Sequence, residues 1–86
     1  LKVHAICCDI TREADVCMLA DQIIEKFGRL DVAINAAGQP LMAAIAKTDK
    51  AMLDRSLAVH LKGPFWFIKH MARVMDKGRG GSIMTI

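Results

Sequence analysis

The chain has 86 residues, of which 53% are hydrophobic and 24% charged, a composition of folded domains rather than of disordered or low-complexity segments. Its apolar runs are far shorter than the ~20 residues of a membrane span, so we expect a cytoplasmic protein without a membrane partner. The net charge of +3 comes from cations scattered among nine carboxylates, which argues against a nucleic-acid partner.

The cysteines and histidines do not have the spacing of a metal site. Cys7, Cys8 and Cys17 form no Cys-x-x-Cys pair, and an odd number does not suit a disulfide framework. The histidines have no ligand spacing to one another or to the cysteines. We therefore predict no metal, and we expect the cysteines to be small buried apolar residues.

The first half of the chain predicts a strand, a helix and a second strand. Residues 1–8 are apolar and lean toward β structure without a helical period. Residues 12–27 have a helical period, with Thr11 as the expected cap and Gly28 as a left-handed end. Residues 30–35 form a short apolar run, typical of a strand buried on both faces.

The second half predicts a helix and a third strand. Residues 39–47 support no single period, and Thr48 is the expected cap of the helix that follows. The glycines in residues 78–81 end the helix, and residues 82–86 are typical of a strand. The residues expected on the apolar face of the helix are Leu57, Leu61, Phe65, Ile68, Ala72 and Met75.

The resulting order, β-α-β-α-β, indicates an α/β fold with a parallel sheet. No repeat or linker divides the chain, so residues 1–86 are expected to form a single unit. Both ends fall inside expected strands, whereas the termini of natural domains usually lie in exposed segments at the surface. We therefore expect a fragment of a larger domain.

Several segments resemble, in order, the short-chain dehydrogenase/reductase family. Residues 31–38 (Asp-Val-Ala-Ile-Asn-Ala-Ala-Gly) resemble the end of its fourth strand, and residues 8–11 (Cys-Asp-Ile-Thr) the end of its third. Residues 57–65 resemble its Val-Asn-Leu-x-Gly-x-Phe helix segment, and residues 81–86 its fifth strand. The resemblance implies part of a Rossmann-like, doubly wound parallel sheet. In that sheet the last two strands pair directly, and another strand separates the first from the second.

The resemblance also implies a site for a nicotinamide dinucleotide, either NAD or NADP. Asp9 would accept a hydrogen bond from the adenine amino group, and Ile10 would lie beside the adenine ring. Asn35, Ala36 and Gly38 would lie along the cofactor, where small side chains let the backbone approach a ribose. Both segments are expected at carboxyl ends of strands, where open parallel sheets bind ligands. The alternative is that Asp9 caps the helix and that the alanines and glycine only form a tight turn.

His60 stands where the family has a catalytic Asn. That Asn acts largely through its main-chain carbonyl, which holds a water in a proton relay, and a carbonyl survives replacement of the side chain. Pro64 has no N–H and cannot bond the carbonyl of His60, which then needs another partner such as water. His60 is thus a catalytic candidate, and the alternative is a helix kink with an ordinary histidine.

The resemblance further implies that the whole protein is an enzyme, an oxidoreductase that transfers hydride between NAD(P) and an alcohol or carbonyl substrate. The family's glycine-rich loop would precede residue 1, and its catalytic Ser and Tyr-x-x-x-Lys would follow residue 86. Residues 1–86 are therefore expected to be a partial NAD(P)-binding domain without activity of its own. One alternative is a non-catalytic dinucleotide-binding or interaction domain of the same fold. Another is an unrelated flavodoxin-like module, which predicts neither Asn-Ala-Ala-Gly nor Asp-Ile at the ends of strands.

Consecutive apolar residues at positions 65–67 cannot all face the sheet. We expect Phe65, with Leu57, Leu61 and Ile68, to pack on the sheet and Trp66 and Phe67 to lie partly on other faces. The resemblance implies a homo-oligomer formed through this helix. The alternative is that Trp66 covers another part of its own domain.

Overall fold

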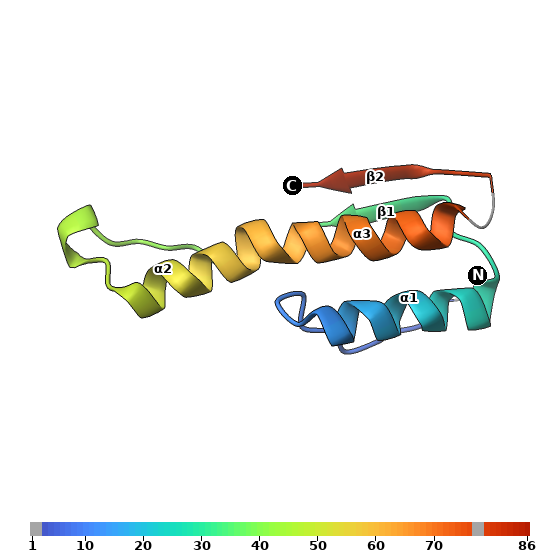
Figure 1. The fold of residues 1–86 in the computed structure, drawn as a ribbon, viewed down its shortest axis with the longest axis horizontal. Helices are drawn as coiled ribbons and strands as arrows, with labels where there is room; N and C mark the ends of the chain where they lie inside the picture. The colour runs from blue at the N-terminus through green and yellow to red at the C-terminus, as the bar shows by residue number, and fades with distance from the viewer. Residues whose placement is uncertain (1–2, 77–78) are drawn as a thin grey trace.

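The computed structural model describes residues 3–76 and 79–86. The elements in chain order are α1 (Glu13–Phe27), β1 (Val32–Asn35), the 3-10 turn η1 (Ile45–Lys47), α2 (Lys50–Leu57), the π-helical turn η2 (Ala58–Lys62), α3 (Gly63–Asp76) and β2 (Ser82–Thr85). Helices α1 and α3 lie side by side, and α3 covers the two strands (Figure 1). Helix α2 and the loop before it extend from this body as an arm, which gives dimensions of 48 × 23 × 22 Å.

The first predicted helix is confirmed as α1, including its end. Gly28 has φ 76° and donates its N–H to the carbonyls of Ile23 and Ile24, the left-handed conformation that glycine adopts without strain. The expected cap is wrong, because the residue before the helix is Arg12 and no side chain caps it. The hydroxyl of Thr11 donates to Asp9 instead.

The last two predicted strands are confirmed as a directly paired, parallel two-stranded sheet. Their register places Val32 opposite Ser82 and Asn35 opposite Thr85. At the two ends of the pair, the N–H of Ser82 donates to the Asp31 carbonyl and the N–H of Ile86 to the Asn35 carbonyl, each at 2.9 Å. The carboxyl end of β1 is therefore held in place by its neighbour.

The prediction that residues 30–35 are buried on both faces is wrong for this chain. Ala33 and Asn35 are buried, whereas Val32 and Ile34 are 60% and 58% exposed. Side chains of a strand alternate between the two faces of a sheet, and the helices of the described residues cover only one of them. Met84 of β2 is also exposed, so the uncovered face is apolar.

The predicted first strand is not present in residues 3–8, and residues 1–2 lie outside the described part. This extended segment passes along α1, where His4 contacts Phe27 with ring centroids 5.5 Å apart, while Cys8 and Ile10 pack against the core. A strand needs a neighbour to accept its hydrogen bonds, and the resemblance implies a strand between this segment and β1. The segment does not pair with β1, so this gap stays open.

The predicted second helix is interrupted. It begins after Asp49, whose carboxylate accepts the N–H of Met52 at 2.9 Å, so Thr48 is not the cap. The hydroxyl of Thr48 donates back to the carbonyl of Ala44. After α2, the chain makes the π-helical turn η2 and continues directly as α3 from Gly63.

The predicted apolar face of this helix is also wrong. The core is formed by Phe67, Met71, Val74 and Met75 of α3 with Val16 and Ala20 of α1 and Ala33 of β1. Of the residues expected on that face, only Met75 is buried, while Leu57, Leu61, Phe65, Ile68 and Ala72 are exposed. A π-turn adds about one residue to the helix, which rotates the following side chains by roughly 100° about the axis. The sequence contains apolar residues on both candidate faces, so the turn decides between them.

The expectation of buried cysteines is wrong as well. Cys7 is exposed, and Cys8 and Cys17 are half-buried. Burial and nearby carboxylates, Asp15 first among them, raise the pKa of the Cys8 thiol.

Polar side chains join α1 to α3 beside the core. Glu13 accepts hydrogen bonds from Lys69 at 2.6 Å and from the ring Nε2 of His70 at 3.0 Å, and His70 is buried. Arg73 reaches Asp21 at 3.3 Å further along the same helix pair. A buried imidazole with a carboxylate partner holds the two helices in a defined register.

These contacts predict a pH effect. The hydrogen bond from Lys69, then that from His70, lowers the pKa of Glu13 below its ordinary value of 4.5. A carboxylate with a lowered folded-state pKa stabilises the fold above its unfolded pKa and loses that contribution as the pH falls through the folded pKa. We expect the free energy of unfolding to fall less between pH ~5 and ~3 in Glu13→Gln than in the unmodified chain. Glu25→Gln, at an exposed position of the same helix, is the control, and equal slopes for all three proteins would contradict the prediction.

Candidate functional site

A pocket lies where β1 ends and α1 begins. Its volume is about 210 Å³. It is lined by Cys8, Asp9, Ile10, Thr11, Ala37, Gly38, Gln39, Arg55 and Val59. Three of the residues assigned to the cofactor by sequence, Asp9, Ile10 and Gly38, thus surround one space.

Asp9 is held in a tight turn before α1. Its Oδ1 accepts the N–H of Thr11 at 3.0 Å and the hydroxyl of Thr11 at 2.7 Å. The hydroxyl contact, then the N–H contact, lowers the pKa of Asp9 below its ordinary value of 3.8, so the carboxylate is ionised at neutral pH. The alternative interpretation is partly supported, because the carboxylate shapes the turn, but it bonds no N–H of α1.

Ile10 is positioned by Gly63, the glycine of the helix segment at residues 57–65, to which the sequence assigned no role in the site. A Cβ added to Gly63 would lie 3.1 Å from Cγ2 of Ile10 and 3.2 Å from the carbonyl oxygen of Ala58. The absence of a side chain at Gly63 therefore lets the segment before α1 rest directly on the junction of η2 and α3. The signal in the sequence is the glycine of the Val-Asn-Leu-x-Gly-x-Phe segment, which Gly63 matches.

Asn35 and Ala36 do not line the pocket. The side chain of Asn35 is buried, and its Oδ1 accepts the N–H of Ala37 at 3.1 Å. This bond closes the turn that carries Gly38 to the pocket. Ala36 is exposed in the same turn. Asn35 thus shapes the loop from beneath, and its contact with a cofactor stays a prediction.

The His60 side chain bridges η2 and the loop after β1. Its Nε2 lies 2.7 Å from the carbonyl oxygen of Gln39 and 3.3 Å from the N–H of the same residue. The shorter distance favours the tautomer in which Nε2–H donates to the carbonyl. A Cβ added to Gly38 would lie 3.2 Å from Cε1 of His60, so the ring packs closely on this loop. The catalytic assignment of His60 stays a prediction.

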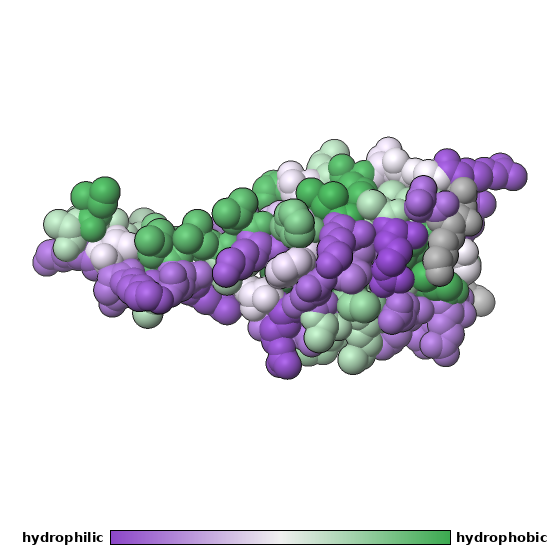
Figure 2. Space-filling model, in the orientation of Figure 1, coloured by the Kyte–Doolittle hydropathy of each residue, from purple (hydrophilic) through white to green (hydrophobic). Residues whose placement is uncertain are grey.

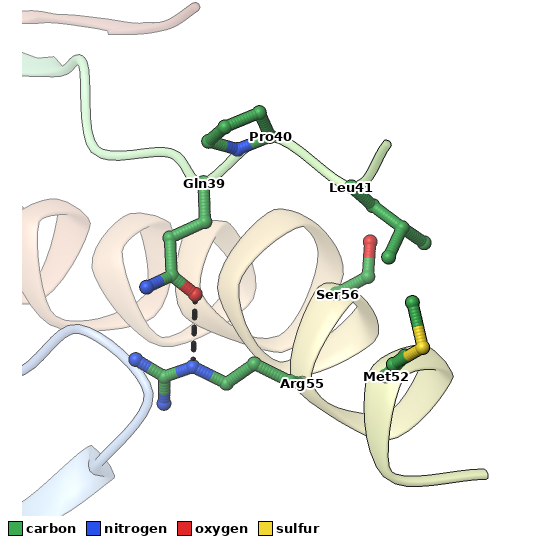
Figure 3. Close-up of a pocket in the computed structure, with 6 residues that line it drawn as sticks. All are labelled: Gln39, Pro40, Leu41, Met52, Arg55 and Ser56. Atoms are coloured by element: carbon green, nitrogen blue, oxygen red, sulfur yellow. Dashed lines mark hydrogen bonds between the residues drawn. The ribbon is translucent and has the colours of Figure 1, made fainter. Parts of the chain in front are cut away.

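Gln39 and Arg55 were not foreseen. The Nε of Arg55 donates to Oε1 of Gln39 at 2.9 Å, and both residues line the pocket. They also separate it from a second cavity of about 160 Å³, which Pro40, Leu41, Met52 and Ser56 complete (Figure 3). The two residues are distant in sequence and belong to no motif, so only the fold reveals their contact.

The described residues contain no group of three or more His, Cys, Asp or Glu side chains placed to hold a metal ion. Within the same part of the chain, none of the helices has the length and apolar character needed to cross a membrane.

Comparison with known proteins assigns the family. The family model for short-chain dehydrogenases matches residues 1–86. The chain belongs to the short-chain dehydrogenase family. It is 42% identical to tropinone reductase-like 1 from Erythroxylum coca over 87 aligned positions, covering 96% of this chain and 32% of that protein. It is 44% identical to momilactone A synthase from Oryza sativa subsp. japonica, covering 91% of this chain and 29% of that protein. The chain thus spans about a third of the length of these relatives.

Solved structures agree with this assignment and with the predicted α/β fold. A short-chain dehydrogenase/reductase mutant from Serratia marcescens superposes with a TM-score of 0.89 at 32% identity, over 98% of this chain and 34% of that one. ElxO with NADP bound superposes with a TM-score of 0.83 at 29% identity, over 90% of this chain and 32% of that one. The predicted Rossmann-like class is therefore confirmed.

Proposed function

We propose that residues 1–86 are part of the NAD(P)-binding domain of an oxidoreductase that transfers hydride between NAD or NADP and an alcohol or carbonyl substrate. The observation that carries the proposal is the pocket beyond β1, where Asp9, Ile10 and Gly38 meet in a member of the short-chain dehydrogenase family. The relatives include proteins named as reductases and dehydrogenases, and one similar structure holds NADP. Like many enzymes of small metabolites, the protein is proposed to work in the cytoplasm.

The residues of the pocket fit the adenosine half of a dinucleotide. The ionised carboxylate of Asp9 offers an acceptor to the adenine amino group, and the apolar side chain of Ile10 borders the space where the ring would lie. Gly38 brings bare backbone to the pocket wall, where a ribose can approach closely. When bound, the dinucleotide would accept the hydride from an alcohol or donate it to a carbonyl group. The residues of this chain orient it and exclude water from one side of it.

His60 has two separable roles in this proposal. Its side chain ties the Gly38–Gln39 loop to the helix through the contact with the Gln39 carbonyl. Its main-chain carbonyl cannot accept a hydrogen bond from Pro64, which has no N–H, and in this proposal it holds a water. Because His60 replaces the catalytic Asn of the family, a second candidate function is a dinucleotide-binding domain of the same fold without catalysis.

The exposed side chains of Leu61, Lys62 and Phe65, with the half-buried Trp66, line a cavity of about 540 Å³ beside η2 and the start of α3. Apolar surface continues from there over the arm, where Figure 2 shows hydrophobic residues in green. We assign this face to contact with a second copy of the protein, because exposed apolar surface of this kind marks association sites.

The cofactor proposal is tested with Asp9→Asn in the full-length protein. The amide keeps an oxygen that accepts from Thr11, so the turn survives, but it loses the charge and the second acceptor oxygen. We expect the dissociation constant for NADH or NADPH, measured by nicotinamide fluorescence, to rise about tenfold, the effect of losing one charge-assisted hydrogen bond.

The matched control is Asp76→Asn, at an exposed position at the end of α3, which should leave the dissociation constant unchanged. Equal affinity of Asp9→Asn and the unmodified protein would contradict the assignment of Asp9. Hydride transfer to or from a panel of alcohols and ketones separates the two candidate functions, since a non-catalytic domain binds the dinucleotide without turnover.

A further inference from the structure

One wall of the pocket beyond β1 comes from outside the two segments assigned to the cofactor, residues 8–11 and 31–38. Arg55 reaches it from α2, and it is the cation among the lining residues. The bond from its Nε to Gln39 fixes the plane of the guanidinium and directs it toward the segment before α1 (Figure 3). Among the described residues, the two terminal nitrogens of Arg55 donate to no other group, so these donors are available to a ligand.

Asp9 lines the same pocket as this guanidinium. Its Oδ1 is used by Thr11, whereas Oδ2 accepts from no group in the described part of the chain. Arg55 is close enough to favour the ionised carboxylate, yet the two side chains form no ion pair among the contacts of residues 3–76 and 79–86. Opposite charges that share a pocket without touching leave space between them for a ligand that satisfies both.

We infer that Arg55 binds the adenine end of the dinucleotide, with its guanidinium against the purine and Asp9 on the exocyclic amino group. This inference rests on the proposed function. A planar guanidinium stacks on aromatic rings and donates to ring nitrogens, while a carboxylate accepts from an amino group. The volume of about 210 Å³ is below the ~300–1,000 Å³ of sites that enclose a whole ligand, so the pocket suits one base rather than the entire cofactor.

A competing role for Arg55 is purely structural. Through Gln39 it connects α2 to the loop that carries Gly38, so its removal could displace that loop without any contact to the cofactor. The two roles differ in what they do to a ligand that has no adenine. Loss of an adenine contact spares such a ligand, whereas displacement of the loop weakens every ligand that uses it.

The test is the variant Arg55→Leu in the full-length protein, with two probes. The dissociation constant for NADH or NADPH is expected to rise about tenfold, as for loss of a cation against an aromatic ring with a charge-assisted hydrogen bond. The dissociation constant for reduced nicotinamide mononucleotide, which lacks the adenosine half, is expected to stay unchanged. Arg55→Lys keeps the charge without the planar fork and should recover part of the affinity for the dinucleotide.

Arg29→Leu is the matched control, because it removes an exposed arginine that pairs with Asp31 outside the pocket. It should leave both dissociation constants unchanged. Equal weakening of dinucleotide and mononucleotide by Arg55→Leu would overturn the inference in favour of the structural role, and so would unchanged affinity for the dinucleotide. If the unmodified protein binds neither NADH nor NADPH, the proposed function itself fails, and the inference fails with it.

Discussion

Replacing Phe67 with alanine is expected to lower the free energy of unfolding of this chain by about 3–5 kcal/mol, the range for a buried phenylalanine. Phe67 is 8% exposed and belongs to the cluster in which α3 meets α1 and β1. The loss combines the transfer of a ring to water with the cavity left behind, because the neighbouring side chains relax only in part. Urea unfolding followed by circular dichroism measures the change.

Phe65→Ala is the matched control, since it removes the same ring two positions earlier on the same helix. Phe65 is 61% exposed, so its replacement should change the stability of the monomer far less. The proposed contact between copies predicts instead that Phe65→Ala lowers the mass of the full-length protein in solution. A larger loss of stability for Phe65→Ala than for Phe67→Ala would contradict this packing, because it would mean that Phe65 lies in the core, as the sequence predicted.

The order of the elements could be predicted from the sequence because each depends on local signals. Gly28 has the positive φ that ends α1, and the apolar runs at residues 30–35 and 82–86 became the paired strands. The expected first strand failed for a different reason. A strand exists only through its neighbours, and the segment at residues 3–8 has none among the described residues.

The face of the second helix could not be predicted because a π-turn has no simple signature in the sequence. The apolar residues of positions 57–75 allow two stripes, one through Phe65 and one through Phe67. The extra residue accommodated at Ala58–Lys62 selects the second stripe. Pro64 showed that the hydrogen bonding is disturbed near this point, but not in which direction the helix turns as a result.

The candidate site was predictable where it depends on motifs and not where it depends on tertiary contacts. Asp9, Ile10 and Gly38 follow expected strand ends, and the fold brings them to one pocket. Arg55 and Gln39 meet only because α2 folds back beside the loop after β1. The same is true of the contact between Gly63 and Ile10, which depends on the angle at which two segments cross.

Gly81→Ala is expected to destabilise the chain by roughly 3 kcal/mol, at the upper end of the range for overpacking. A Cβ at this position would lie 2.6 Å from the carbonyl oxygen of Asp31 and 2.9 Å from Sδ of Met75. The methionine can move, but the carbonyl is backbone and accepts the N–H of Ser82 at 2.9 Å. The added methyl group must therefore displace the start of β2 from β1. Unfolding in urea gives the size of the effect.

Gly80→Ala separates this steric effect from the conformational preference of glycine. Gly80 has φ 81° with nothing within 4 Å of an added Cβ, so alanine there costs only the left-handed conformation, about 1–2 kcal/mol. Only Gly81→Ala should also speed amide hydrogen exchange at Ser82, because only that methyl group separates the Ser82 N–H from its acceptor. If both variants lose similar stability and Ser82 keeps its protection, the close approach of β2 to the Asp31 carbonyl is not what requires glycine at position 81.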